Sequence, residues 1–312
     1  MSGSKLKNYF SEIITGGDIF LHAAEEVLEL KKTKYQELAL IQSPTFGKTL
    51  LLDNICQISE VDEFIYHELL VHTPCIFHSN PKNVLILGGG DGCALREALR
   101  WKSVENVTLV DIDEEVVNYS KTWLTDLNQN SLNHPKARII IEDAFNFIKN
   151  SDLKWDIIIC DLSDPIENSP ALALFTKEFF ESLTQISHPQ TIISVQSGPA
   201  APPDHFCFTR VANTLKRVFP YFKACLCFCQ AYITPLAFSI VSSQPFKKLN
   251  AGEVENIIQN NLEGDLKYLD GETFLASQNL PKFLKQALEK EQVVYTLDNL
   301  PQWFNSDLNK NV

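Results

Sequence analysis

The sequence has no apolar run of the length that a membrane helix needs. Nowhere in its 312 residues does an uninterrupted apolar stretch approach the roughly 20 residues that cross a bilayer. The N-terminal stretch MSGSKLKNYFSEIITGGD also lacks the long apolar segment of a secretory signal peptide. We therefore expect a protein that does not enter a membrane and works in the cytoplasm.

Positive charge is scarce as well. The chain has 27 Lys and Arg against 39 Asp and Glu, which gives a formal net charge of −12. Nucleic acids and anionic membranes reward Lys and Arg, so this balance argues against both as partners. A negative surface attracts cationic ligands, although the need for solubility alone can explain such a charge.

The eight cysteines form no CxxC pair and no Cys and His cluster with zinc spacing. Most of them lie in apolar, strand-like runs. Cys225, Cys227 and Cys229 alternate along ACLCFCQ, which predicts three sulfurs on one face of a strand. We interpret the cysteines as buried structural thiols and expect no metal.

No internal repeat is visible, and the order of predicted elements divides the chain in two. Residues 1–75 are typical of a small antiparallel β domain that ends in a linking helix at 62–74, which stops at a proline. In residues 76–312, short apolar strands alternate with helices, which is the pattern of a parallel sheet covered on both faces. The last strands, around 223–233 and 237–243, predict an antiparallel hairpin at one edge. The predicted fold class is α/β, a Rossmann-like, methyltransferase-type doubly wound sheet with a small N-terminal antiparallel β domain.

The glycine turn that opens the second domain lacks the third glycine of a strict dinucleotide fingerprint. VLILGGGDGCALREALRW predicts a strand, a turn and a helix, with Cys93 where GxGxxG would require glycine. Gly88, Gly90 and Gly92 fit the looser GxGxG of nucleoside binders that hold no pyrophosphate. Asp91 stands inside the turn, where its carboxylate would repel a phosphate.

A carboxylate follows each of the first four strands of the second domain. Ligands of open α/β sheets bind at these strand ends. Helix N-capping explains one or two of the acids, but it does not easily explain two carboxylates in the loop DLSDP. The acids are Asp91, Asp111, Asp143, Asp161 and Asp164.

Such a pocket calls for a ligand with ribose hydroxyls, an adenine amine and positive charge. An acid after the second strand typically accepts hydrogen bonds from ribose hydroxyls. S-adenosylmethionine-like sulfonium nucleosides meet all three requirements. S-adenosylmethionine itself ends in an amino acid, whereas its decarboxylated form ends in an aminopropyl ammonium. Because Asp91 would pair with the ammonium and leave an α-carboxylate without a partner, the turn favours the decarboxylated form.

Long segments of the chain resemble the polyamine aminopropyltransferases, the spermidine and spermine synthase family. They are YQELALIQSPTFGKTLLLDNICQISEVDEFIYHELLVH, VLILGGGDGCALREALRWKSVENVTLVDIDEEVV and WDIIICDLSDPIENSPALALFTKEFFESL. VQSGPA and the late YLDGETFLASQNLPKFLKQALEKE are most similar to the thermospermine synthase and bacterial triamine or agmatine branch.

The resemblance implies a transferase of polyamine biosynthesis with spermidine synthase or spermine/thermospermine synthase activity. Such an enzyme moves an aminopropyl group from decarboxylated S-adenosylmethionine, its co-substrate, to putrescine, agmatine or spermidine and releases methylthioadenosine. It has no covalently bound cofactor and no metal. The family also implies a homodimer or homotetramer with the N-terminal sheet at the interface.

The resemblance further implies a role for each matching residue. Asp161 is implied as the general base, which takes the proton from the attacking amine. The residues implied to contact the nucleoside co-substrate are Gln36, Gly88, Gly90, Asp91, Asp111, Asp143, Ala144 and Pro170. Those implied to contact the amine substrate are Tyr66, His67, Asp91, Asp164 and Gln196. Gln36 can also be interpreted as an ordinary polar residue of a strand. Tyr66 and His67 can also be interpreted as residues that only pack within the linking helix.

The chain departs from the family at one wall of the implied acceptor site. The family commonly carries a longer, aromatic-rich segment where this chain reads AYITPLAFSIVSS, several residues shorter near 233–238. Two alternatives therefore stay open. One is a non-catalytic paralogue that binds polyamines or partners an active subunit, against which the complete acidic set argues. The other is an S-adenosylmethionine-dependent methyltransferase on the same fold, against which Asp91 argues.

Overall fold

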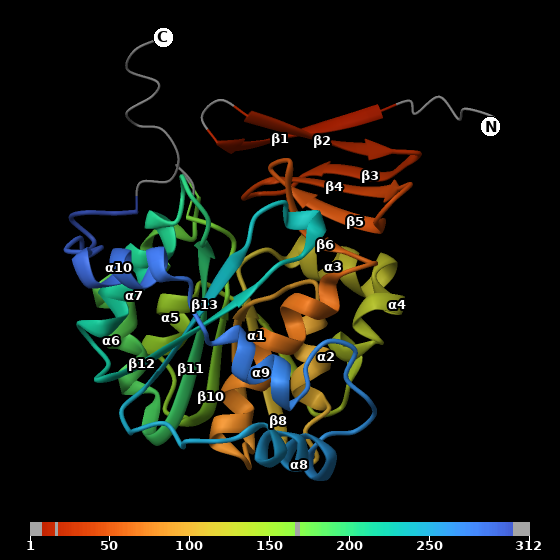
Figure 1. Cartoon of the computed structure of the whole chain (residues 1–312). Coiled ribbons are helices and arrows are strands. Elements are labelled where there is room, and N and C mark those ends of the chain that lie inside the picture. Colours follow the sequence, from red (N-terminus) through yellow and green to blue (C-terminus); the bar gives the residue numbers. More distant parts are fainter. Residues whose placement is uncertain (1–7, 16–17, 166–168, 302–312) are drawn as a thin grey trace.

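Three sheets form the frame of the protein (Figure 1). The computed structural model describes residues 8–15, 18–165 and 169–301. A two-stranded hairpin and a four-stranded sheet come first in the chain, and a seven-stranded sheet follows. None of the helices in these described ranges is both long and apolar enough to cross a membrane.

The N-terminal strands pair in antiparallel fashion throughout. The hairpin consists of β1 (Asn8–Thr15) and β2 (Asp18–Ala24). The four-stranded sheet consists of β3 (Glu26–Lys32), β4 (Glu37–Ser43), β5 (Gly47–Leu52) and β6 (Ile55–Ser59). Between β5 and β6, Asp53 and Asn54 adopt φ values of 49° and 65°, which are the conformations of a tight hairpin turn. The predicted antiparallel β domain is therefore present, and β1 to β3 extend it beyond the strands that the sequence pattern marked.

The seven-stranded sheet has the order β12-β13-β11-β10-β7-β8-β9. Its strands are β7 (Asn83–Gly88), β8 (Asn106–Asp111), β9 (Ala137–Ile141), β10 (Trp155–Asp161), β11 (Ser187–Pro199), β12 (Tyr221–Cys227) and β13 (Leu236–Ser242). The five neighbouring strands β9, β8, β7, β10 and β11 run parallel, while β13 is antiparallel to both of its neighbours. This confirms the doubly wound α/β class and the antiparallel hairpin at one edge.

Helices cover both faces of this sheet (Figure 1). One face packs against α1 (Glu63–His78), α2 (Cys93–Leu99), α8 (Ala251–Asn261) and α9 (Gly271–Ser277). The other packs against α5 (Ala144–Lys149), α6 (Lys177–Gln185) and α7 (Phe206–Lys216), and α10 (Lys282–Lys290) lies on α7. Along β7, Val84 and Ile86 belong to the first core and Leu85 and Leu87 to the second. This alternation lets one apolar strand serve two cores.

A further group of helical elements lies in the chain between β8 and β9. They are α3 (Glu114–Trp123), α4 (Thr125–Asn128) and the short 3₁₀ turn η1 (Ser131–Asn133). Leu124 and Leu127 share a buried cluster with Leu40 and Leu50 of the N-terminal sheet. Two further 3₁₀ turns, η2 (Leu172–Phe175) and η3 (Gln230–Tyr232), follow β10 and β12.

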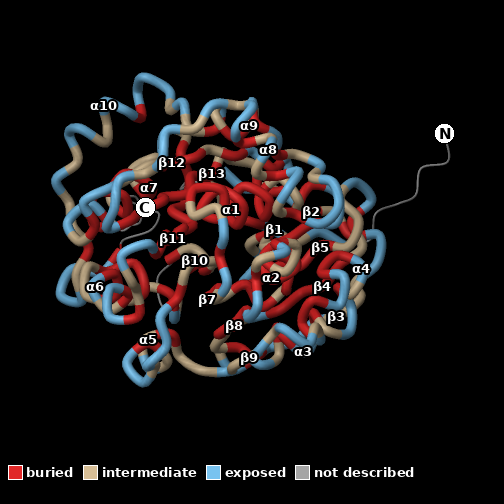
Figure 2. The backbone as a smooth tube through the Cα atoms, turned by 90° about the horizontal axis from the view of Figure 1, so that it is seen from below, coloured by how far each residue is buried: buried red, intermediate tan, exposed pale blue. Residues whose placement is uncertain are grey.

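Helix α1 is longer than the sequence predicted. It does not stop at Pro74 but continues to His78 with the proline inside. A proline inside a helix removes one backbone hydrogen bond, and here buried packing compensates, because α1 is buried over most of its length and lies against β11 and β10. Seen from below, the buried backbone follows α1 and β11, while α10 at the rim is more exposed (Figure 2). The division predicted between residues 75 and 76 falls inside this helix.

All eight cysteines are free thiols and buried, as predicted. The expectation that three of them share one strand is wrong in part. Strand β12 ends at Cys227, and Cys229 lies beyond it. Cys225, Cys227 and Cys229 nevertheless pack into the same core.

Candidate active site

A pocket opens at the carboxyl ends of the parallel strands and is also lined by residues of the N-terminal sheets. Every residue that the sequence marked as a site residue lines it. They are Gln36, Tyr66, His67, Gly88, Gly90, Asp91, Asp111, Asp143, Ala144, Asp161, Asp164, Pro170 and Gln196. Strand ends β7, β8, β9 and β10 supply the acids because parallel strands finish at the same edge of a sheet.

The glycine turn packs closely against the ends of the neighbouring strands. Gly88 has φ 82°, and the Gly89 amide donates to the Asp161 carbonyl at 3.0 Å. A Cβ at Gly90 would stand 2.7 Å from Asp111 Oδ2, closer than Cβ atoms approach other atoms in proteins. Glycine at these positions therefore allows the acids that end β8 and β10 to flank the turn.

Asp161 has one carboxylate oxygen fixed and one free. The Tyr66 hydroxyl donates to Asp161 Oδ1 at 2.7 Å. Asp161 Oδ2 is buried and has no hydrogen-bond partner among the described residues. Desolvation in the pocket, with the nearby charge of Asp91, raises the pKa of Asp161 to about 6, while His67 and the Tyr66 hydroxyl act in the opposite direction. The free oxygen can therefore accept a proton from a bound ligand near neutral pH.

Asp91 lies between the pocket and a buried histidine. Its Oδ1 accepts a hydrogen bond from the Cys93 amide at 2.7 Å and stands 3.8 Å from His67 Nε2. On the other side of the imidazole, His67 Nδ1 lies 2.8 Å from Glu63 Oε2. Asp91 precedes Gly92, the N-cap residue of α2, so it is not an acid of the first helical turn. It lines the pocket.

Asp111 and Asp143 occupy the ends of β8 and β9. Asp111 Oδ1 accepts from the Asp113 amide at 2.8 Å, and burial raises the pKa of Asp111 to about 6. Asp143 caps α5 by accepting from the Asn146 amide at 3.0 Å. Capping is therefore one role of Asp143, as the alternative interpretation held, although the residue also lines the pocket.

Gln36 contacts protein as well as the pocket. Its Nε2 donates to Asp113 Oδ2 at 3.0 Å, and the Thr33 hydroxyl donates to the same oxygen at 2.6 Å. Asp113 is the N-cap residue of α3. This contact joins the start of β4 to the end of β8 across the mouth of the pocket.

A second pair lies further along the pocket. Gln196 Nε2 donates to Asp164 Oδ1 at 2.7 Å, and Gln196 Oε1 is buried without a partner among the described residues. Burial raises the pKa of Asp164 to about 6, and the hydrogen bond from Gln196 opposes this shift. A buried acceptor without a donor costs free energy unless a ligand or water supplies one. Asp164 and Gln196 together can therefore receive a cationic amine.

Glu12 and Tyr232 are among the lining residues that were not found from the sequence. Glu12 of β1 reaches the pocket and accepts from the Cys56 amide at 3.1 Å, with His22 Nε2 2.6 Å from its Oε2. Tyr232 lies in the segment that looked shortened, packs against the Tyr66 ring at 5.7 Å and donates to the Gln57 carbonyl at 2.8 Å. The pattern YFSEII carried a weak signal for Glu12, a charged residue on the buried side of an alternating strand. Tyr232 offered none.

Two groups of potential metal ligands involve His67. They are Glu63, His67 and Cys93, and His67, Asp91 and Asp161, with ligand atoms within 4.8 Å of one another. Burial alone would lower the pKa of His67, but its hydrogen bond with Glu63 and the charge of Asp91 raise it to about 9. A protonated imidazole has no lone pair for a metal, so these groups fit ion pairing better than metal binding.

The fold and the pocket define a Rossmann-like α/β protein with a carboxylate-lined pocket at the ends of its parallel strands. Residues 63–251 match the model of the spermine/spermidine synthase domain, and residues 9–60 match the spermidine synthase tetramerisation domain. The chain therefore belongs to the spermine/spermidine synthase family of aminopropyltransferases.

Similar proteins cover almost the whole chain. A polyamine aminopropyltransferase of Synechococcus sp. (strain JA-2-3B'a(2-13)) is 37% identical over 310 residues, 97% of this chain and 99% of that protein. Thermospermine synthase ACAULIS5 of Arabidopsis thaliana is 36% identical over 294 residues, 94% and 86% of the two chains. A spermidine synthase solved with the transition state analogue AdoDATO superposes with a TM-score of 0.83 at 27% identity, covering 93% of this chain and 99% of that one. The resemblance read from the sequence is confirmed.

Proposed function

We propose that the protein transfers an aminopropyl group from decarboxylated S-adenosylmethionine to a di- or polyamine and releases methylthioadenosine. The observation that carries this proposal is the free, buried Oδ2 of Asp161 in a pocket lined by further carboxylates. The curated relatives are named polyamine aminopropyltransferases, and a structural neighbour holds a transition state analogue. Both support the same chemistry in this chain.

The reaction is a displacement at the carbon next to the sulfonium. The amine nitrogen forms the new C–N bond as the C–S bond breaks, and the electron pair leaves with neutral methylthioadenosine. An amine is protonated at pH 7 and cannot attack, so the proton must leave first. Asp161 receives it at Oδ2, while Tyr66 fixes the orientation of the carboxylate through Oδ1.

The remaining pocket residues divide between the two substrates. Asp91 pairs with the aminopropyl ammonium, Asp111 with the ribose hydroxyls and Asp143 with the adenine amine. The nucleoside also contacts Gln36, Gly88, Gly90, Ala144 and Pro170. The acceptor contacts Tyr66, His67, Asp164 and Gln196. These roles follow the resemblance and agree with the lining of the pocket.

The acceptor is a di- or polyamine of the kind used in the spermidine or thermospermine branch. Tyr232, Thr234 and Leu236 line the pocket, so the segment that looked shortened still contributes a wall. This observation favours an active enzyme over a non-catalytic paralogue.

The function is tested by incubating the protein with decarboxylated S-adenosylmethionine and, separately, putrescine, agmatine, cadaverine and spermidine. Methylthioadenosine release and the matching aminopropylated product are measured by chromatography and mass spectrometry. Product with one or more amines supports the proposal. Tight binding of the nucleoside and an amine without product would favour the non-catalytic alternative, and a methylated product from S-adenosylmethionine would favour a methyltransferase.

Asp91→Ala is expected to weaken the preference for the decarboxylated co-substrate. Loss of the carboxylate removes the partner of the aminopropyl ammonium and the repulsion of the α-carboxylate of S-adenosylmethionine. One charge-assisted contact accounts for roughly a tenfold to hundredfold change in relative affinity. Calorimetric binding of both nucleosides to wild type and variant checks this, and an unchanged affinity ratio would refute the role.

The hairpin β1–β2 leaves one apolar face uncovered. Tyr9, Ile13, Ile19 and Leu21 expose 55%, 64%, 64% and 55% of their surface. We propose that this face lies in the interface of a homodimer or homotetramer, in agreement with the description of the family model that residues 9–60 match.

A further inference from the structure

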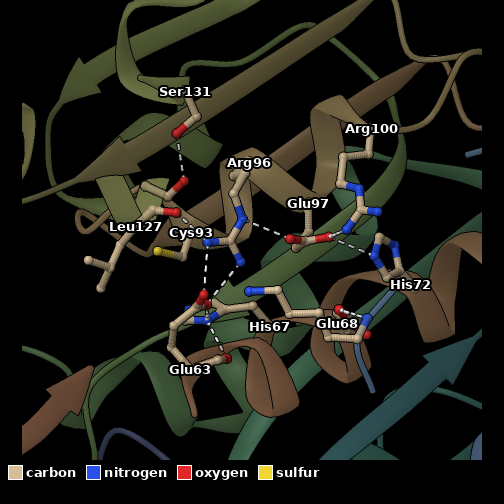
Figure 3. A network of polar contacts seen from close by, with 12 residues as sticks. Glu63, His67, Glu68, His72, Cys93, Arg96, Glu97, Arg100, Leu127 and Ser131 are labelled. Carbon is tan, nitrogen blue, oxygen red and sulfur yellow. Dashed lines mark hydrogen bonds and ion pairs between the residues drawn. The ribbon is translucent and has the colours of Figure 1, made fainter. Parts of the chain in front are cut away.

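A network of buried charged side chains surrounds His67, which is one of the residues that line the pocket (Figure 3). Arg96 of α2 donates through Nη1 and Nη2 to Oε1 and Oε2 of Glu63, each at 2.9 Å. On its other side, Arg96 Nε donates to Glu97 Oε1 at 2.7 Å. The side chains of all three residues are less than one tenth exposed. The two-point contact between Arg96 and Glu63 fixes the plane of that carboxylate.

Glu63 in turn holds His67 from one side. His67 Nδ1 lies 2.8 Å from Glu63 Oε2 and 2.8 Å from the Glu63 carbonyl. The opposite ring nitrogen, Nε2, stands 3.8 Å from Asp91 Oδ1. The imidazole therefore has a hydrogen-bond acceptor at Nδ1 and a carboxylate within ion-pair distance of Nε2, an arrangement that favours the doubly protonated ring.

We propose that Glu63, clamped by Arg96, is a positioning residue that holds His67 as an oriented cation beneath Asp91 and Asp161. This inference rests on the proposed function. The carboxylates of Asp91 and Asp161 repel each other in a site that is closed to much of the solvent. A fixed positive charge between them offsets the repulsion, so that Asp161 stays ionised and can accept the proton of the acceptor amine.

The titratable groups around His67 come from four parts of the fold. Glu63 and Tyr66 lie on α1, Asp91 lies in the glycine turn, Asp161 ends β10, and the α2 residues are Cys93 and Arg96. Burial opposes the charge on His67, but Glu63 and Asp91 outweigh it and raise its pKa to about 9. The groups that face Asp161 are Asp91, His67 and Tyr66, and of these His67 and Tyr66 lower the pKa of Asp161.

The direct test is the protonation state of His67 in the wild-type protein, which requires no substrate. The ¹³Cε1 resonance of His67, assigned with the variant His67→Gln, is expected to titrate about two pH units above an ordinary histidine. A ring that is neutral at pH 7 in the wild type would overturn the inference. Because this measurement involves no turnover, it remains decisive even if no amine is accepted.

The second test is Glu63→Gln. The amide oxygen can still accept from Nδ1, but the negative charge is gone, so the His67 titration is expected to fall by more than one pH unit. A smaller fraction of His67 is then protonated, so less positive charge stabilises the ionised form of Asp161. The pH at which kcat reaches half of its maximum is expected to increase by about one pH unit. This corresponds to a several-fold lower kcat at pH 6 to 7.

Glu97→Gln is the matched control. It removes the same charge from the other side of Arg96, where Glu97 contacts His72 and Arg100 and not His67. The control is expected to lose stability while its His67 titration and its pH profile stay those of the wild type. A shift of equal size in both variants would mean that the network acts only through stability and would overturn the inference.

Discussion

Asp161→Asn is expected to remove most turnover and to leave binding of the nucleoside intact. Asparagine keeps the shape of the side chain, and its amide oxygen can still accept the hydrogen bond that Tyr66 donates to Asp161 Oδ1 at 2.7 Å. It cannot take a proton from the acceptor amine. A general base contributes roughly a hundredfold to ten-thousandfold to a rate, so kcat is expected to fall within that range.

The measurement is methylthioadenosine release at saturating substrates, with calorimetric binding of methylthioadenosine as the second readout. Asp156→Asn is the matched control, because Asp156 lies on the same strand but accepts from the amides of Lys82 and Asn83 at 2.8 Å, away from the pocket. That variant is expected to retain turnover. If Asp161→Asn keeps a kcat within tenfold of the wild type, another group takes the proton.

Arg96→Met is expected to destabilise the protein by about 3–5 kcal/mol, the usual cost of breaking a buried ion pair by removing one partner. Methionine fills much of the space but leaves two buried carboxylates, Glu63 and Glu97, without the guanidinium between them. Arg96 also donates to the Leu127 carbonyl, which loses its donor as well. His67, His72 and Arg100 keep their own contacts with the two acids and compensate only in part.

Urea unfolding followed by fluorescence and circular dichroism measures the loss. Lys82→Met provides the comparison, since Lys82 and Glu105 form an ion pair of similar length, 2.9 Å, with both side chains more than half exposed. Solvent screens such pairs, so little change in the free energy of unfolding is expected there. Equal losses in the two variants would contradict the view that burial makes the Arg96 contacts essential.

The acidic half of the site could be predicted from the sequence because its geometry is local. Asp91, Asp111, Asp143 and Asp161 each follow an apolar strand, and parallel strands that alternate with helices bring such positions to one edge. The alternation of β7 between two cores was readable for the same reason. These features depend on the spacing of apolar residues along the chain and on the right-handed crossover from strand through helix to the next strand. Both are determined by short stretches of chain.

The other half depends on contacts between distant segments. Glu12 and Tyr232 enter the pocket from β1 and from the turn after β12. The local pattern gives only a weak signal for Glu12 and none for Tyr232. Gln36 is held by Asp113, which lies 77 positions away in the chain. Pro74 indicates a helix end by local rules, yet packing on the large sheet carries α1 past it. At Pro74, tertiary burial outweighs the local preference.

The positions of the pocket residues along the chain determine when the pocket can be completed during synthesis. Its walls begin at Glu12 and are completed by Tyr232 and Leu236, and β13 inserts between β11 and β12 although it is the last strand to be synthesised. A ribosome-bound chain that ends before residue 236 therefore lacks one wall of the pocket and the strand that joins β12 to the sheet. The complete pocket therefore exists only after this strand has entered the sheet.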